Sequence, residues 1–191
     1  MRNSLRFLLC LLALAASIAL LAGGALAQDG RDLSEEARRA YAKGLKEAGT
    51  LVRDKQYAPA LALLETLLGQ RPREPQARFL KGVAQTEQGQ AAAAITTFQG
   101  LIEDYPELPE PYNNLAVLYA QQGEYENAKA ALETAIKAAP DWPVARENLG
   151  DLYARLAAVQ YDRAAMLDKS NQSAPAKLAL VRQLLAPTAP R

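Results

Sequence analysis

The sequence predicts an all-α chain built from a repeated pair of helices. Apolar residues recur at helical spacing through residues 109–142, stop at Gly123, resume at Tyr125 and end at Pro140. This pattern is typical of one helix, a tight turn and a second helix. Neither helix could bury its apolar stripe alone, so a similar hairpin must lie against it.

The neighbouring hairpins are found by shifting the sequence 34 residues in either direction. Small residues recur at the eighth and twentieth positions of each copy, counted from Pro109, and proline recurs at the thirty-second. These residues are Ala48, Ala60 and Pro72 in the first copy, Gly82, Ala94 and Pro106 in the second, and Ala116, Ala128 and Pro140 in the third. Small residues let two helices approach closely, and proline ends the second helix. The pattern resembles the tetratricopeptide repeat family, whose repeat has this length.

The resemblance implies a superhelical solenoid of helical hairpins over residues 35–185. Three good copies are expected at about 41–74, 75–108 and 109–142, followed by a degenerate copy at 143–185 and a C-terminal capping helix within it. A non-repeating helical bundle is the alternative, but the same positions match in three successive copies.

Periodicity and helix-end signals also predict the individual helices. Outside the third copy, helices are expected over residues 35–53, 58–68, 76–88, 91–104, 144–167 and 175–185. Lys55 occupies the turn position that Gly89 and Gly123 hold in the next copies, so the first turn is expected to differ.

The fourth copy is expected to depart from the pattern. Gly150 matches the eighth position, but no glycine or proline interrupts residues 151–167, so we expect one long helix. A polar turn then leads to a last helix, with Ser173 as its cap. Four apolar residues of the last helix are expected to close the stack: Leu178, Val181, Leu184 and Leu185.

The first 27 residues are interpreted as a secretory signal peptide. Arg2 and Arg6 precede an apolar run over residues 7–21, and residues 25–27 form a small-x-small cleavage pattern. An uncleaved leader that anchors the chain in the inner membrane is the alternative, because the apolar run approaches the length of a spanning helix. Cleavage would make the protein periplasmic. A lipid anchor at Cys10 is disfavoured by the large residue before it.

Short segments flank the predicted solenoid. Residues 28–34 form a polar lead-in, and the proline-containing residues 186–191 are expected to be a disordered tail.

The composition excludes several kinds of site. There is no histidine, and the one cysteine lies in the leader, so the rest of the chain lacks imidazole and thiolate for zinc, iron or nucleophilic catalysis. No glycine-rich phosphate loop occurs. Of 22 Lys and Arg against 21 Asp and Glu, two arginines leave with the leader, so the net charge becomes −1 and nothing favours nucleic acid. We expect no metal and no cofactor.

Carboxylates are the remaining candidates for catalysis. A pair of them could hydrolyse a glycoside, and the candidates are Glu103, Asp104, Glu124, Glu126 and Asp151. Solvated charges on helix surfaces and turns are the more ordinary explanation. A hydrolase acting on envelope glycans is therefore an alternative, and a self-associating structural protein is another.

The family resemblance implies where a partner would bind. Positions four, five, six, nine, twelve and thirteen of each copy face the concave groove in this family. The corresponding candidates are Arg78, Phe79 and Val83 in copy two, Tyr112, Asn113, Asn114, Val117 and Gln121 in copy three, and Arg146, Glu147, Asn148 and Asp151 in copy four. Their amides could bond an extended backbone. Phe79 and Tyr112 could anchor a ligand or instead pack between hairpins.

Family members that clamp a terminal carboxylate use lysine or arginine together with asparagines. Asn114 fits the middle asparagine, but the partner positions hold Phe79, Val83, Val144 and Asn148. A carboxylate without a cation would be desolvated and unpaired, so such a clamp is not expected. The sequence therefore predicts an exported, non-catalytic adaptor of the bacterial cell envelope, with a peptide or protein partner in its groove.

Overall fold

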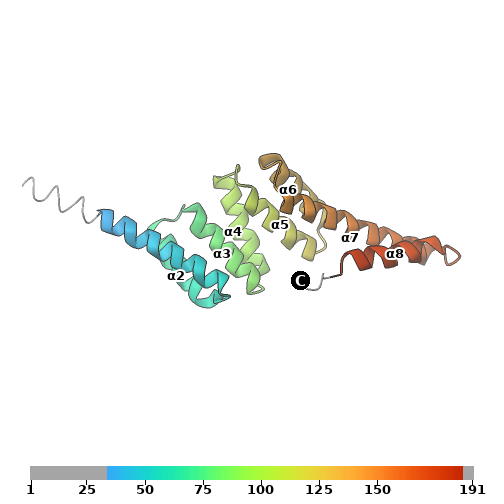
Figure 1. The fold of residues 1–191 in the computed structure, drawn as a ribbon, viewed down its shortest axis with the longest axis horizontal. Helices are drawn as coiled ribbons and strands as arrows, with labels where there is room; N and C mark the ends of the chain where they lie inside the picture. The colour runs from blue at the N-terminus through green and yellow to red at the C-terminus, as the bar shows by residue number, and fades with distance from the viewer. Residues whose placement is uncertain (1–33, 187–191) are drawn as a thin grey trace, which may run out of the picture. The chain divides into compact units, whose positions relative to one another are not determined.

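A computed structural model describes residues 34–186 (Figure 1). Residues 34–53 are helical, and the helices that follow are α2 Tyr57–Gln70, α3 Pro75–Glu87, α4 Ala91–Asp104, α5 Pro109–Gln121, α6 Tyr125–Ala138, α7 Pro143–Leu167 and α8 Ser173–Leu184. Over this range the chain is all-α, with eight helices packed as sequential hairpins, which confirms the predicted fold class. The expected leader, most of the lead-in and residues 187–191 of the tail lie outside the described residues.

The chain divides into two compact units, residues 1–47 and 48–191. In the first unit the described residues, 34–47, are helical, and Arg38 forms an exposed ion pair with Glu35 at 2.8 Å. The second unit contains the remaining turns of this helix and all of α2 to α8. Every groove residue expected from the sequence lies in the second unit.

Hairpins of the second unit pair α3 with α4, α5 with α6 and α7 with α8. The small residues of the repeat lie where these helices meet, and both Ala94 and Ala128 are completely buried. At Gly82 the contact is closer still, since a Cβ there would lie 2.6 Å from Cε1 and Cζ of Phe98. The close approach that the sequence pattern predicted is therefore confirmed in copies two and three.

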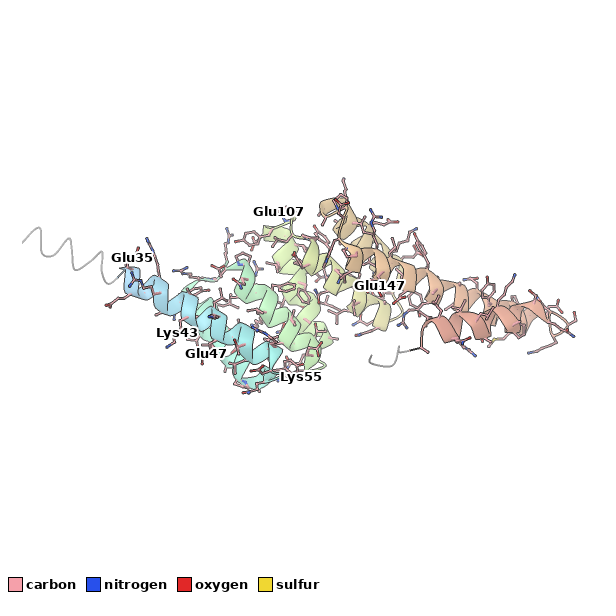
Figure 2. All side chains as sticks on the ribbon, in the orientation of Figure 1. Glu35, Lys43, Glu47, Lys55, Glu107 and Glu147 are labelled. Carbon is pink, nitrogen blue, oxygen red and sulfur yellow. The ribbon has the colours of Figure 1, made fainter. Side chains whose placement is uncertain are left out.

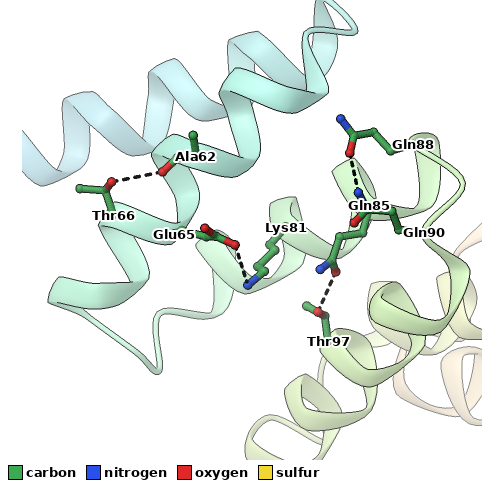
Figure 3. A network of polar contacts seen from close by, with 8 residues as sticks. All are labelled: Ala62, Glu65, Thr66, Lys81, Gln85, Gln88, Gln90 and Thr97. Atoms are coloured by element: carbon green, nitrogen blue, oxygen red, sulfur yellow. Dashed lines mark hydrogen bonds and ion pairs between the residues drawn. The ribbon is translucent and has the colours of Figure 1, made fainter.

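Polar side chains connect helices of the first hairpins (Figure 3). Lys81 on α3 lies 3.7 Å from Glu65 on α2, and Thr97 on α4 donates a 2.7 Å hydrogen bond to Gln85 on α3. Gln85 is buried, with a relative exposure of 7%. Its bond to Thr97 therefore satisfies a polar group that has lost water.

The three hairpin turns share one backbone conformation. Lys55, Gly89 and Gly123 have φ angles of 59°, 76° and 79°. In each turn the next residue donates its N–H to a carbonyl five residues earlier, as from Gln56 to Leu51 at 2.8 Å. This is the hydrogen-bond pattern of a left-handed helix end. The expectation that the Lys55 turn would differ is wrong, because lysine adopts here the left-handed conformation that glycine occupies more easily, and the same type of hydrogen bond closes the turn.

The fourth copy follows the prediction of one long helix, since α7 runs without a break for 25 residues. The repeat match at Gly150 carries no packing, because a Cβ there would meet nothing within 4 Å. The eighth position of this copy therefore differs physically from Gly82, although the residue type is the same.

The cap of α8 differs from the prediction. The N-cap position is Gln172, whose side chain makes no capping hydrogen bond, and Ser173 is the first helical residue. Oδ1 of Asn171, one residue before the N-cap, accepts a 3.0 Å hydrogen bond from the amide of Ala174. The preceding turn is closed by Asp168, whose Oδ1 accepts from the hydroxyl and the amide of Ser170 at 2.7 and 2.9 Å. Ser173 therefore lies one residue past the N-cap position and does not act as the cap.

The contact face of α8 also differs in one residue. Leu178 is buried and Val181 and Leu185 are half-buried, whereas Leu184 is 70% exposed. Positions 178, 181 and 185 follow a helical stripe, and residue 184 falls outside it. Leu184 therefore does not close the stack as expected.

Candidate functional site

The first helices of successive hairpins lie beside one another. Helix α5 contacts α3 on one side and α7 on the other. All the groove residues expected from the sequence lie on these three helices. This shared face of α3, α5 and α7 is called the groove below.

A pocket of about 190 Å³ lies between α5 and α7. Its buried floor consists of Ala116, Leu132 and Leu152. Its other lining residues are Val117, Ala120, Gln121, Asn148, Asp151 and Arg155. Four of the predicted groove residues therefore meet here: Val117, Gln121, Asn148 and Asp151. We refer to this cavity as the α5/α7 pocket.

An amide pair links the two walls of the α5/α7 pocket. Asn148 donates a 2.8 Å hydrogen bond from Nδ2 to Oδ1 of Asn113. Asn113 is buried, with 8% of its surface exposed, so the bond replaces water that this amide has lost. Within residues 34–186 the Oδ1 atom of Asn148 accepts no hydrogen bond, so it remains an acceptor at the pocket wall. The predicted role of Asn113 is thus filled by a contact between helices.

Arg155 and Ala120 were missed among the expected residues. They occupy the thirteenth position of copy four and the twelfth of copy three, so the positional rule used for the other residues reaches both. Asp151 and Arg155 are both exposed, and within residues 34–186 neither forms an ion pair or a hydrogen bond. The pocket wall therefore offers an unpaired carboxylate and an unpaired guanidinium.

A second cavity, of about 260 Å³, lies where α3 and α5 begin. It is lined by Pro75, Gln76, Phe79, Leu108, Glu110 and Pro111. The Phe79 ring is half-buried and packs against Phe98, with ring centroids 5.9 Å apart and an angle of 55° between the planes. Phe79 therefore both packs within its hairpin and lines a cavity. We refer to this one as the α3/α5 pocket.

Several predicted groove residues are engaged locally. Arg78 on α3 pairs with Asp104 on α4 at 2.5 Å. Arg146 donates to the carbonyl of Pro140 from Nε and Nη2 at 2.9 and 2.7 Å. Asn114 donates to the carbonyl of Glu110, one turn earlier in its own helix, at 2.8 Å. These three side chains stabilise helices and loops of their own chain.

The remaining predicted residues are distributed between core and surface. Val83 packs against the buried cluster around Phe98, and Tyr112 packs against the cluster around Ala116. Glu147 is exposed on α7, one turn before Asp151 (Figure 2). The groove surface is thus a mixture of half-buried aromatic and aliphatic groups with exposed polar ones.

The carboxylates proposed as catalytic candidates lie on α4 (Glu103 and Asp104), at the start of α6 (Glu124 and Glu126) and on α7 (Asp151). Asp104 on α4 is held by Arg78, and Glu124 accepts a 2.8 Å hydrogen bond from Asn127. Over residues 34–186 no three His, Cys, Asp or Glu side chains are grouped to hold a metal ion. In the same range no helix has both the length and the apolar character needed to cross a bilayer.

Comparison with known proteins agrees with this architecture. Sequence profiles described as tetratricopeptide repeat match residues 45–109 and 85–156. Together the two matches cover more than half of the chain. No curated protein matches the chain in sequence.

Solved structures with the same fold include the Sgt2 repeat domain from Aspergillus fumigatus. It is 19% identical with a TM-score of 0.59, over 63% of this chain and 81% of that one. The first repeat domain of Spaghetti (RPAP3), bound to the HSP90 peptide SRMEEVD, is 14% identical with a TM-score of 0.58, over 61% and 93%. YrrB, described as having an unusual peptide-binding site, is 25% identical with a TM-score of 0.53, over 56% and 55%. With the repeat period, the paired helices and the two profile matches in agreement, the chain belongs to the tetratricopeptide repeat family.

Proposed function

We propose that the groove binds an extended segment of another protein and that the chain acts as a non-catalytic adaptor. The observation that carries this proposal is the α5/α7 pocket, where Asn148 Oδ1, Asp151 and Arg155 stand unengaged above a buried apolar floor. An apolar floor can hold one side chain of a ligand, and the polar wall can bond its backbone or its neighbours. In the free protein these exposed polar groups are hydrogen-bonded to water, so they carry no desolvation penalty. In a complex they can form hydrogen bonds or ion pairs with the ligand instead.

Two of the similar structures support binding as the role. The Spaghetti domain was solved with a peptide, and YrrB is described by its peptide-binding site. The HSP90 peptide SRMEEVD of the first is acidic. Here Phe79, Val83, Val144 and Asn148 occupy the partner positions of the clamp, so the lysine or arginine that a carboxylate-clamping relative uses is absent from them. The ligand of this chain therefore belongs to a different chemical class.

The cell envelope is the proposed location. The leader over residues 1–27 has a positive start, an apolar run and a small-residue cleavage pattern, which together are typical of exported proteins. Mass analysis of the protein recovered from the envelope tests this. A chain beginning at Gln28 would support periplasmic release, and a full-length chain in the membrane fraction would support the anchored alternative.

Photo-crosslinking in cells tests the binding role. A photoreactive amino acid is placed at Gln121 or Asp151, which line the α5/α7 pocket from opposite walls. Glu126, exposed on α6 and outside both pockets, is the control position. We expect discrete adducts of the same mass from both pocket positions and none from Glu126. Adducts from Glu126 alone would place the partner on another face and contradict the proposal.

A further inference from the structure

The two groove pockets are joined by one face of α5. Glu110 lines the α3/α5 pocket, whereas Val117 and Gln121 line the α5/α7 pocket. Together with Asn114, these residues are spaced four, three and four apart, so they form a single stripe along the helix. A ligand lying along this stripe would reach both pockets.

The distance between the pockets limits the ligand. On α5 the first pocket is centred near Glu110 and Pro111, and the second near residues 116–121. About eight helical residues separate these centres, which corresponds to about 12 Å along the axis. An extended chain advances about 13 Å over four residues, and residues i and i+4 project to the same side. Two apolar side chains separated by four positions would therefore fill both pockets.

The unengaged charges of the groove are mostly acidic. Glu110 lines the first pocket, Asp151 lines the second, and Glu147 lies one turn before Asp151. In residues 34–186 none of these three carboxylates has an ion-pair partner. Each pocket thus has an apolar interior and a free carboxylate at or beside its wall.

The cations of the same three helices are largely committed elsewhere. Arg78 is paired with Asp104, Lys81 lies 3.7 Å from Glu65, and Arg146 donates to the Pro140 carbonyl. On α7, Arg155 lines the α5/α7 pocket and has no partner among the described residues. An acidic ligand would be repelled by three free carboxylates and attracted by one free guanidinium. A basic ligand would be attracted by the three carboxylates and repelled by the one guanidinium.

From this juxtaposition we infer that the groove takes a basic, extended peptide segment carrying two apolar side chains four residues apart, with lysine or arginine next to them. This inference rests on the proposed binding function and specifies its ligand. Glu110 and Asp151 select the cations, and the two pockets select the spacing. An acidic peptide or a nucleic acid would be repelled by the same carboxylates.

Synthetic peptides test the spacing and the charge separately. The probe is fluorescein-labelled GAKLASKLAG, in which the two leucines are four residues apart and each follows a lysine. The comparison peptides move the second leucine to i+3 or i+6, or replace both lysines by glutamate. We expect fluorescence anisotropy with the full chain to give the highest affinity for the i+4 lysine peptide, and an affinity that falls as salt is raised. Equal affinities across spacings, or preference for the glutamate peptide, would overturn the inference.

Variants of the protein assign the effect to the two pockets. Glu110→Gln and Asp151→Asn should each weaken the lysine peptide about threefold, the effect expected for a partly exposed ion pair, and should leave the glutamate peptide no weaker. Gln76→Trp and Val117→Trp should each fill one pocket and weaken binding at least about tenfold. Gln160→Trp, at an exposed position of α7 outside both pockets, is the matched control.

The outcomes separate this inference from the function on which it rests. One outcome is that Val117→Trp abolishes peptide binding while the affinity does not depend on leucine spacing or lysine charge. This result would support the groove as a binding site and overturn the inferred ligand class. A display library of random twelve-residue peptides that yields no binder sensitive to Val117→Trp would overturn both. Selected binders rich in lysine or arginine, with paired apolar residues at i and i+4, would support both.

Discussion

Gly82 lies so close to Phe98 that a Cβ at this position would be 2.6 Å from two atoms of the ring. Phe98 is completely buried, so relieving this contact would require its ring to shift within the core. The corresponding glycine of the fourth copy, Gly150, has nothing within 4 Å of the same added atom. The same residue type at the same repeat position is therefore required in one copy and replaceable in another.

The first prediction uses these two glycines as a matched pair. Gly82→Ala should destabilise the protein by about 1–3 kcal/mol through overpacking. Gly150→Ala should stabilise it by about 0.5–1 kcal/mol, because alanine favours the helix more than glycine does. Urea unfolding followed by circular dichroism measures both. Similar changes in the two variants would show that the hairpin contact at Gly82 is misassigned.

A second prediction concerns Lys55, whose φ of 59° is unfavourable for a residue with a side chain. Lys55→Gly should stabilise the protein by about 1 kcal/mol, since the left-handed conformation costs glycine little. The reverse change at Gly89, to lysine, should destabilise it by a similar amount. A lower unfolding midpoint for Lys55→Gly would mean that the lysine side chain contributes more than its backbone strain costs.

The third prediction tests the amide pair across the α5/α7 pocket. Asn113→Ala should cost about 1 kcal/mol, because a buried hydrogen bond between α5 and α7 is lost. In a double-mutant cycle with Asn148→Ala the two changes should be coupled by about 0.5 kcal/mol or more. Strictly additive changes would show that the 2.8 Å contact does not stabilise the protein.

A fourth prediction concerns pH. Hydrogen bonds from the side chain and then the backbone of Ser170 lower the pKa of the Asp168 carboxyl below its ordinary value of 3.8. A carboxyl whose pKa is lower in the folded state stabilises that state above the unfolded pKa, and this contribution is lost as pH falls through the folded value. NMR titration should therefore show a low pKa at Asp168 that rises in Ser170→Ala. An unchanged pKa in that variant would contradict the assigned cause.

Much of the fold could be predicted because the same residue types recur at equivalent positions in successive copies of the repeat. Prolines 34 residues apart begin α3, α5 and α7, and buried alanines recur in the second helices. The Lys55 turn was misjudged because a residue with a side chain can adopt the left-handed conformation at some cost, so the absence of glycine does not exclude this turn. The cap of α8 was misplaced because serine is a good capping residue by type, whereas the backbone makes Ser173 the first helical residue, after Gln172.

The groove was harder to predict than the fold. Repeat positions correctly placed the expected residues on α3, α5 and α7. They did not indicate that Arg78, Asn114 and Arg146 would bond within their own chain, because a helical position does not determine where a long side chain ends. Applying the same rule one turn further along α7 would have found Arg155.

The α5/α7 pocket is the proposed binding site of the partner. The most direct measurement is crosslinking from Gln121 in two backgrounds, Val117→Trp, which fills the pocket, and Val159→Trp, which enlarges an exposed valine of α7 outside both pockets. We predict that the adduct is lost in Val117→Trp and retained in Val159→Trp. An adduct that persists unchanged in both backgrounds would contradict binding in this pocket.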